Sequence, residues 1–297
     1  MSLPEIPVPP KDIFDAIDDE SFCLFIGSGV SQLLGALGWE DLCTEIIDEC
    51  LSKDWITEPV REAYVNSHYK KRILNICFEK FVQFGQEERY FQIIANSCKG
   101  QEELVNNYNI YDEIKKIPAK YLSTNFDLLF SNKLHEDSVV FKNEDFDSEN
   151  IHREVLYQIH GSLCEPDTIV LTTENYARKY TLQSYQEFLK TIFTENLILF
   201  IGCGLSEPEI TIPLFNNMIS ENPRRNYALK GYKHNTLQFL QDDFVHYSTL
   251  GVELVAFDIE VRGYNLLFDI LAYWNREITK NCDLVFKDLD QIERVAK

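Results

Sequence analysis

Short apolar runs that end in small and polar residues recur along this chain of 297 residues. The runs are continuous rather than alternating, which is typical of strands buried on both faces of a parallel sheet. Residues 169–180 and 252–260 are further strand candidates, and residues 185–196 carry apolar positions at helical spacing. The pattern predicts an α/β fold, with a parallel sheet flanked by helices. The four clearest runs, each with the cluster that ends it, are "FCLFIGSGVS" (22–31), "KYLSTNFD" (120–127), "EVLYQIHGS" (154–162) and "LILFIGCGLSEPE" (197–209).

Between about residues 39 and 118 the pattern changes to helical periodicity with little strand signal. We therefore expect residues 1–39 and 118–297 to form the sheet domain and residues 40–117 to form a helical insertion, which would be a lid or a small domain. The acidic stretch 135–154 has no clean period and is expected to be a surface loop.

The carboxyl ends of parallel strands lie along one edge of a sheet, and ligands bind in the crevice outside that edge. The polar clusters should therefore meet there. "GSGVS" is a glycine-rich turn whose backbone N–H groups can hold a phosphate, although ordinary turn chemistry would also explain its glycines. "GCGLSEPEI" offers Gly202 and Gly204 for close approach and Ser206 as a donor, or else Ser206 caps a helix with Glu207 and Glu209 in its first turn.

Asn125 and His160 each have two interpretations. Asn125 is a good helix N-cap, and Asp127 would suit the first turn of a helix that began there. His160 could be a core histidine, but it ends a strand at the presumed ligand edge and precedes Gly161. Separate structural roles at four parallel strand ends are less plausible than one site built from all four.

Composition narrows the possible ligands. The chain has 28 Lys and Arg against 48 Asp and Glu, a formal charge of −20, so a nucleic acid is not an expected partner. None of its apolar runs reaches the length of a membrane span, and the N-terminus does not resemble a signal peptide, so we expect a cytoplasmic protein. The eight cysteines include no Cys-x-x-Cys pair, so we expect reduced thiols and no metal site.

The four motifs in this order resemble the sirtuin-like, Rossmann-like NAD-binding fold, and more closely its bacterial branch of anti-phage defence proteins. "GWEDL" (38–42) also fits that branch. The resemblance covers about residues 22–210. It implies that NAD is the substrate and that the first glycine turn binds its pyrophosphate, through Gly27, Ser28, Gly29 and Ser31.

The same resemblance implies roles for the other motifs. Asn125 would orient a water and the nicotinamide ribose, Asp127 would line the nicotinamide pocket, and His160 would be the general base. Thr124, where the deacylating members usually have Gln, would also contact NAD. Gly202, Gly204 and Ser206 would contact ribose and phosphate.

The deacylating members of the family carry a four-cysteine zinc module and an acyl-peptide-binding stretch, and residues 161–200 contain neither. We therefore expect an NAD hydrolase that releases nicotinamide and ADP-ribose and depletes NAD during anti-phage defence. Such an activity needs control, so a homo-oligomer or a regulatory partner protein is expected. Two alternatives are a non-catalytic sensor of NAD or an ADP-ribose-type nucleotide, and a protein deacylase or ADP-ribosyltransferase.

Overall fold

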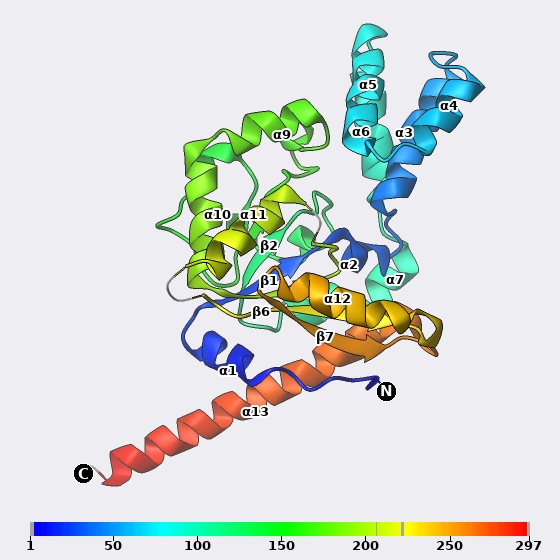
Figure 1. Cartoon of the computed structure of the whole chain (residues 1–297). Coiled ribbons are helices and arrows are strands. Elements are labelled where there is room, and N and C mark those ends of the chain that lie inside the picture. Colours follow the sequence, from blue (N-terminus) through cyan, green and yellow to red (C-terminus); the bar gives the residue numbers. More distant parts are fainter. Residues whose placement is uncertain (1–2, 206, 221–222, 296–297) are drawn as a thin grey trace.

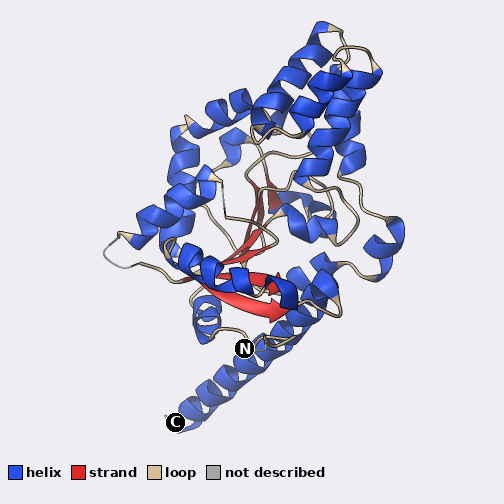
Figure 2. Ribbon diagram, turned by 45° about the vertical axis from the view of Figure 1, so that its right-hand side comes forward, coloured by secondary structure: helices blue, strands red, loops and turns tan. Residues whose placement is uncertain are grey.

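The computed structural model of the chain describes residues 3–205, 207–220 and 223–295. Its centre is a seven-stranded sheet in the order β3-β4-β2-β1-β5-β6-β7, in which every pair of neighbours is parallel. The predicted α/β class is confirmed (Figure 2). The strands are β1 (Phe22–Ile26), β2 (Lys120–Ser123), β3 (Val139–Val140), β4 (Leu156–Gln158), β5 (Leu197–Ile201), β6 (Asn226–Tyr232) and β7 (Val252–Asp258).

The four strands with polar clusters, β4, β2, β1 and β5, are adjacent in the sheet. Every residue of β1 and of β5 is buried, as their continuous apolar runs predict. Alternate residues of β1 enter different cores: Leu24 and Ile26 pack on one face of the sheet, and Cys23 and Phe25 on the other. The polar clusters are therefore held at the middle of one edge of a rigid sheet.

Helices cover both faces of the sheet (Figure 1). The core on one face includes side chains of α1, α8 and α13, and the core on the other includes side chains of α10, α11 and α12. Among the described residues, none of the helices combines the length and apolar character needed to cross a bilayer. The helices outside the segment between β1 and β2 are α1 (Lys11–Asp18), α9 (Thr173–Tyr180), α10 (Gln183–Glu195), α11 (Pro208–Met218), α12 (Gln238–Ser248) and α13 (Leu266–Val295). Short 3-10 helices span Ser131–Lys133, Glu136–Ser138, Asn143–Asp145, Pro166–Thr168, His234–Thr236 and Gly263–Asn265.

The segment between β1 and β2 is helical and has two parts. Helices α3–α6 stand away from the sheet (Figure 1) and pack around a third core, which includes Ile46, Leu74 and Phe81 and is completed by Ile169 and Leu171 from the segment after β4. Helix α8 differs, because its Tyr111 and Ile114 belong to the core of the sheet. The helices of this segment are α2 (Ser28–Gln32), α3 (Trp39–Ser52), α4 (Glu58–Val65), α5 (Lys70–Gln83), α6 (Glu87–Ser97), α7 (Glu102–Asn107) and α8 (Ile110–Ile114).

Three predictions of local structure were wrong or incomplete. Residues 169–180 are not a strand: Thr172 and Asn175 cap each other's backbone, and this capping box starts helix α9. The stretch 135–154 is not only a loop, since it contains the edge strand β3, which pairs with β4. Strand β6 was not predicted, although it lies between β5 and β7.

Candidate active site

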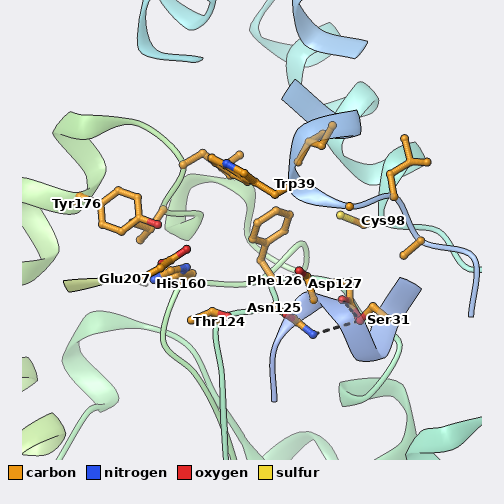
Figure 3. Close-up of a pocket in the computed structure, with 17 residues that line it drawn as sticks. Ser31, Trp39, Cys98, Thr124, Asn125, Phe126, Asp127, His160, Tyr176 and Glu207 are labelled. Atoms are coloured by element: carbon orange, nitrogen blue, oxygen red, sulfur yellow. Dashed lines mark hydrogen bonds between the residues drawn. The ribbon is translucent and has the colours of Figure 1, made fainter. Parts of the chain in front are cut away.

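The ends of β2 and β4 and the turns after β1 and β5 surround a cavity of about 90 Å³ (Figure 3). Six of the predicted site residues line it: Ser28, Ser31, Thr124, Asn125, Asp127 and His160. Helix α3, the loop before it and Cys98 after α6 add apolar walls, which include Trp39 and Leu42. The cavity therefore combines groups from the sheet edge with a cover from the helical segment. Ser206 lies outside the described residues.

Asn125 does not cap a helix. Residues 124–130 are irregular, and the next helical turn begins at Ser131, so the helix-start interpretation is wrong. Instead the buried Asn125 amide donates from Nδ2 to the Gly27 carbonyl at 3.1 Å and to Ser31 Oγ at 3.2 Å. Its backbone N–H donates to Ser123 Oγ at 3.0 Å. The polar residues at the end of β2 thus fix a side-chain amide against the turn that follows β1.

Asp127 belongs to the same buried network. Ser31 Oγ donates to Asp127 Oδ2 at 2.6 Å and also shares a hydrogen bond with the Tyr111 hydroxyl at 2.8 Å. Burial raises the pKa of Asp127, while the bond from Ser31 opposes that rise. Gln158 Nε2 fixes the segment after β2 by donating to the backbone carbonyls of Asn125 and Asp127 at 2.9 and 3.0 Å. Tyr111 and Gln158 were not predicted, and their contacts arise only in the folded chain.

His160 follows β4 and is only 4% exposed. Its ring packs edge-on against Tyr176 of α9, with the ring centres 5.3 Å apart. Burial lowers the pKa of His160 to about 4, although the nearby Glu207 carboxylate acts in the opposite direction. The imidazole is therefore neutral near pH 7 and able to accept a proton.

The two glycine turns are bonded to each other. Gly29 N–H donates to the Gly202 carbonyl at 2.9 Å, and Gly27 N–H donates to the Ile201 carbonyl at 2.9 Å. A Cβ atom on Gly27 would lie 2.4 Å from the Gly202 oxygen, which leaves no room for any other residue. Close packing of the turns therefore explains these glycines. It also uses two of the N–H groups expected to bind phosphate, while Ser28 remains in the cavity wall.

A second cavity, of about 310 Å³, lies beside the same turns and is lined by Gly29, Gly202 and Gly204. Its other walls include Lys230 of β6, Tyr247 of α12 and Tyr264. Lys230 Nζ pairs with Asp243 at 2.8 Å. Sequence reasoning missed Lys230 because β6 was not predicted, and it assigned no role to Tyr247 or Tyr264. The paired turns thus lie between one cavity with polar side chains and another with aromatic walls.

Two more residues of the first cavity were not predicted as site residues. Tyr176 fell in the segment that was assigned to a strand, and Glu207 was considered only for the first turn of a helix. Figure 3 shows both beside His160. Among the described residues, no group of three or more His, Cys, Asp and Glu side chains is placed to bind a metal ion.

Residues 119–247 match the family model of the SIR2-like domain. The parallel sheet agrees with that match, and the predicted sirtuin-like resemblance is confirmed.

Similar proteins can be named individually. The chain is 24% identical over 283 residues to the NAD(+) hydrolase ThsA of Bacillus cereus (strain MSX-D12), covering 91% of this chain and 55% of that protein. It is 22% identical over 296 residues to the NAD(+) hydrolase ThsA of Acinetobacter baumannii (strain 532279), with 92% and 56% covered. The chain spans about half the length of the curated relatives it matches.

Proposed function

We propose that the chain hydrolyses NAD at the bond between nicotinamide and ribose, releasing nicotinamide and ADP-ribose. The observation that carries the proposal is that a buried neutral imidazole, His160, and a fixed amide, Asn125, both lie in the wall of one cavity. The names of the similar proteins support it, since they are NAD(+) hydrolases. As the resemblance to the anti-phage branch implies, the activity would deplete NAD in the cytoplasm during anti-phage defence.

The sizes of the two cavities support a binding mode in which the two ends of NAD occupy different cavities. A cavity of 90 Å³ is smaller than the roughly 300–1,000 Å³ typical of ligand pockets, so it would take only the nicotinamide end. The adenosine end would occupy the 310 Å³ cavity, against the rings of Tyr247 and Tyr264. The pyrophosphate would then cross the paired glycine turns near Ser28. This arrangement would place the bond to be broken near His160 and Asn125.

The chemistry needs few groups. Breaking the bond passes through an oxocarbenium-like state, and nicotinamide leaves as a neutral molecule without a general acid. His160 would accept the proton of the attacking water, and Asn125 would position that water or the ribose. Asn125 Oδ1 is buried, and none of the described residues hydrogen-bonds it, so it is available as an acceptor. Asp127 would line the nicotinamide pocket and hold Ser31 in place.

The direct test is to incubate the purified chain with NAD and to quantify nicotinamide and ADP-ribose over time. We expect both products from the parent and at least about 100-fold less from His160→Gln and Asn125→Ala. Glu165→Gln, a change on the surface outside the cavity, should retain the parent rate. Tight NAD binding without any product, with and without the protein encoded by a neighbouring gene, would instead support the nucleotide sensor. We also propose control by self-association or by a partner, and the assay at several protein concentrations tests this.

One observation favours a second candidate, transfer to an acceptor as in a deacylase or ADP-ribosyltransferase. An open groove of about 760 Å³ lies between α9, α10 and α11 and shares Tyr176 with the first cavity. Its lining is largely apolar and includes Tyr180, Leu189 and Phe193. Incubation with labelled NAD and an acylated peptide separates the two candidates. Acyl-ADP-ribose or a labelled peptide would support transfer, whereas free ADP-ribose alone would support hydrolysis.

A further inference from the structure

Glu207 is placed at a helix start without acting as its cap. It is the N-cap residue of α11, yet its side chain makes no capping hydrogen bond to that helix. The side chain instead lines the first cavity with His160, and Figure 3 shows the carboxylate beside the imidazole ring. Two residues earlier, Leu205 is buried and adopts the left-handed backbone conformation, with φ +50°, although it is not a glycine. The Glu207 carboxylate therefore lies beside the His160 ring and does not cap α11.

The charged groups around His160 determine how easily its imidazole can take a proton. Three charged groups act on its imidazole: Glu207, Lys179 and Lys71. Lys179 is 2% exposed, and its ammonium lies over the rings of Phe146 and Tyr185. A base that accepts a proton becomes an imidazolium, which burial disfavours; Lys71 disfavours it too, as does Lys179 when protonated, although burial lowers the pKa of Lys179 to about 7. Of the three groups, Glu207 alone favours the charged imidazole.

We propose that Glu207 is a positioning residue for His160: its carboxylate orients the imidazole and stabilises the imidazolium that forms when His160 takes a proton. This inference rests on the proposed NAD hydrolysis. In that reaction the water oxygen bonds to the ribose carbon, and the bond from that carbon to nicotinamide breaks with its electron pair going to nicotinamide. The water proton passes to His160 and later to solvent. The carboxylate stays ionised throughout and gains or loses no proton.

A purely structural role for Glu207 would give a different outcome. Lys71 of α5 has its ammonium 3.7 Å from the Glu207 carboxylate and 3.7 Å from the centre of the Tyr176 ring. If Glu207 only tethered α5 to the sheet domain, then removing Lys71 would harm activity as much as removing Glu207. If Glu207 acts on His160, then removing Lys71 leaves that carboxylate in place and its effect on the imidazole intact.

The experiment compares Glu207→Gln, Glu207→Asp and Lys71→Met with the parent in steady-state NAD cleavage. The matched control is Glu165→Gln, because the Glu165–Lys142 pair has side-chain exposures of 47% and 38%, against 38% and 34% for Glu207 and Lys71. We expect Glu207→Gln to lower kcat by about 10- to 100-fold with KM changed by less than about twofold. Glu207→Asp should recover most of that loss, and Lys71→Met and Glu165→Gln should remain within about threefold of the parent.

Two kinetic results would overturn the inference: a kcat of Glu207→Gln within about twofold of the parent, or an equal loss in Lys71→Met. Failure of the proposed function is distinguishable, because the parent itself would then release no nicotinamide. In that case nuclear magnetic resonance of ring-labelled histidine decides, with His160→Gln assigning the His160 signal among the six histidines. Glu207→Gln should lower the pKa of His160, and an unchanged pKa would reject the pairing.

Discussion

The burial of His160 predicts an unusual response to acid. An exposed imidazole with a pKa of 6.5 would be about 90% protonated at pH 5.5 and useless as a base. Because burial lowers the pKa of His160 to about 4, nearly all of it stays neutral at that pH. The kcat for NAD cleavage should therefore change by less than about twofold between pH 7.5 and 5.5 and should fall only as the pH nears 4.

Stability should respond where activity does not. The unfolded chain binds a proton at His160 below about pH 6.5, whereas the folded chain does so only near pH 4. Protonation therefore favours the unfolded chain first. The stability associated with the neutral imidazole is complete above pH 6.5 and is lost as the pH falls towards 4. Since one pKa unit is about 1.4 kcal/mol, the loss is about 3 kcal/mol over the whole interval and about 1 kcal/mol by pH 5.5.

Urea unfolding of the parent and of His160→Gln at pH 7.5 and 5.5 measures this loss. The free energy of unfolding should fall by about 1 kcal/mol more in the parent than in the variant, because glutamine does not titrate. Groups that do not interact with His160 titrate alike in both proteins and cancel in the comparison, and Lys179, whose pKa burial lowers to about 7, is present in both. Equal falls in the two proteins, together with a tenfold drop of parent kcat at pH 5.5, would show that His160 has an ordinary pKa and would refute the reasoning.

Three further predictions follow from the site. Asn125→Ala should abolish NAD cleavage and also cost about 0.5–1.5 kcal/mol in urea unfolding, because the Gly27 carbonyl loses the amide that donates to it and keeps only the Val30 N–H. Gly29→Ala should cost about 1–3 kcal/mol in the same assay, since its Cβ would lie 2.8 Å from the Gly202 oxygen; a stability equal to the parent's would mean that the turns move apart freely. If α3–α6 close over bound substrate, their amides should gain hydrogen-exchange protection with a non-hydrolysable NAD analogue while those of α8 do not, and unchanged protection in α3–α6 would argue against a lid.

The parts of the fold that sequence predicted best are those where several signals agree. Strands β1 and β5 are fully buried, and continuous apolar runs are the pattern that such strands require. Once four such runs are taken as parallel strands, the geometry of a sheet brings their ends to one edge. For this reason Asn125, Asp127 and His160 could be predicted to lie near one another without knowledge of any contact between them.

Other features depended on competition between local signals or on distant contacts. The residues after Ile169 look like a strand, but the Thr172–Asn175 capping box selects a helix, and Tyr176 then enters the site from α9. Asn125 looks like an N-cap, but its amide bonds the Gly27 carbonyl, 98 residues away. Such a contact leaves no periodic trace in the sequence. Propensity alone could not have chosen between these outcomes.

The helical segment between β1 and β2 contributes to the site in two different ways. Its α3–α6 part packs around a core that Ile169 and Leu171 complete, and it supplies Trp39 and Leu42 to the cavity wall. Its α8 part is packed into the core of the sheet and supplies the Tyr111 hydroxyl that bonds Ser31 beneath the cavity. Because α3–α6 lie outside the core of the sheet, they can shift with fewer lost contacts than α8, whose movement would disturb Ser31 and, through it, Asp127. Movement of α3–α6 could thus open and close the cavity while the network that fixes Asn125 stays assembled.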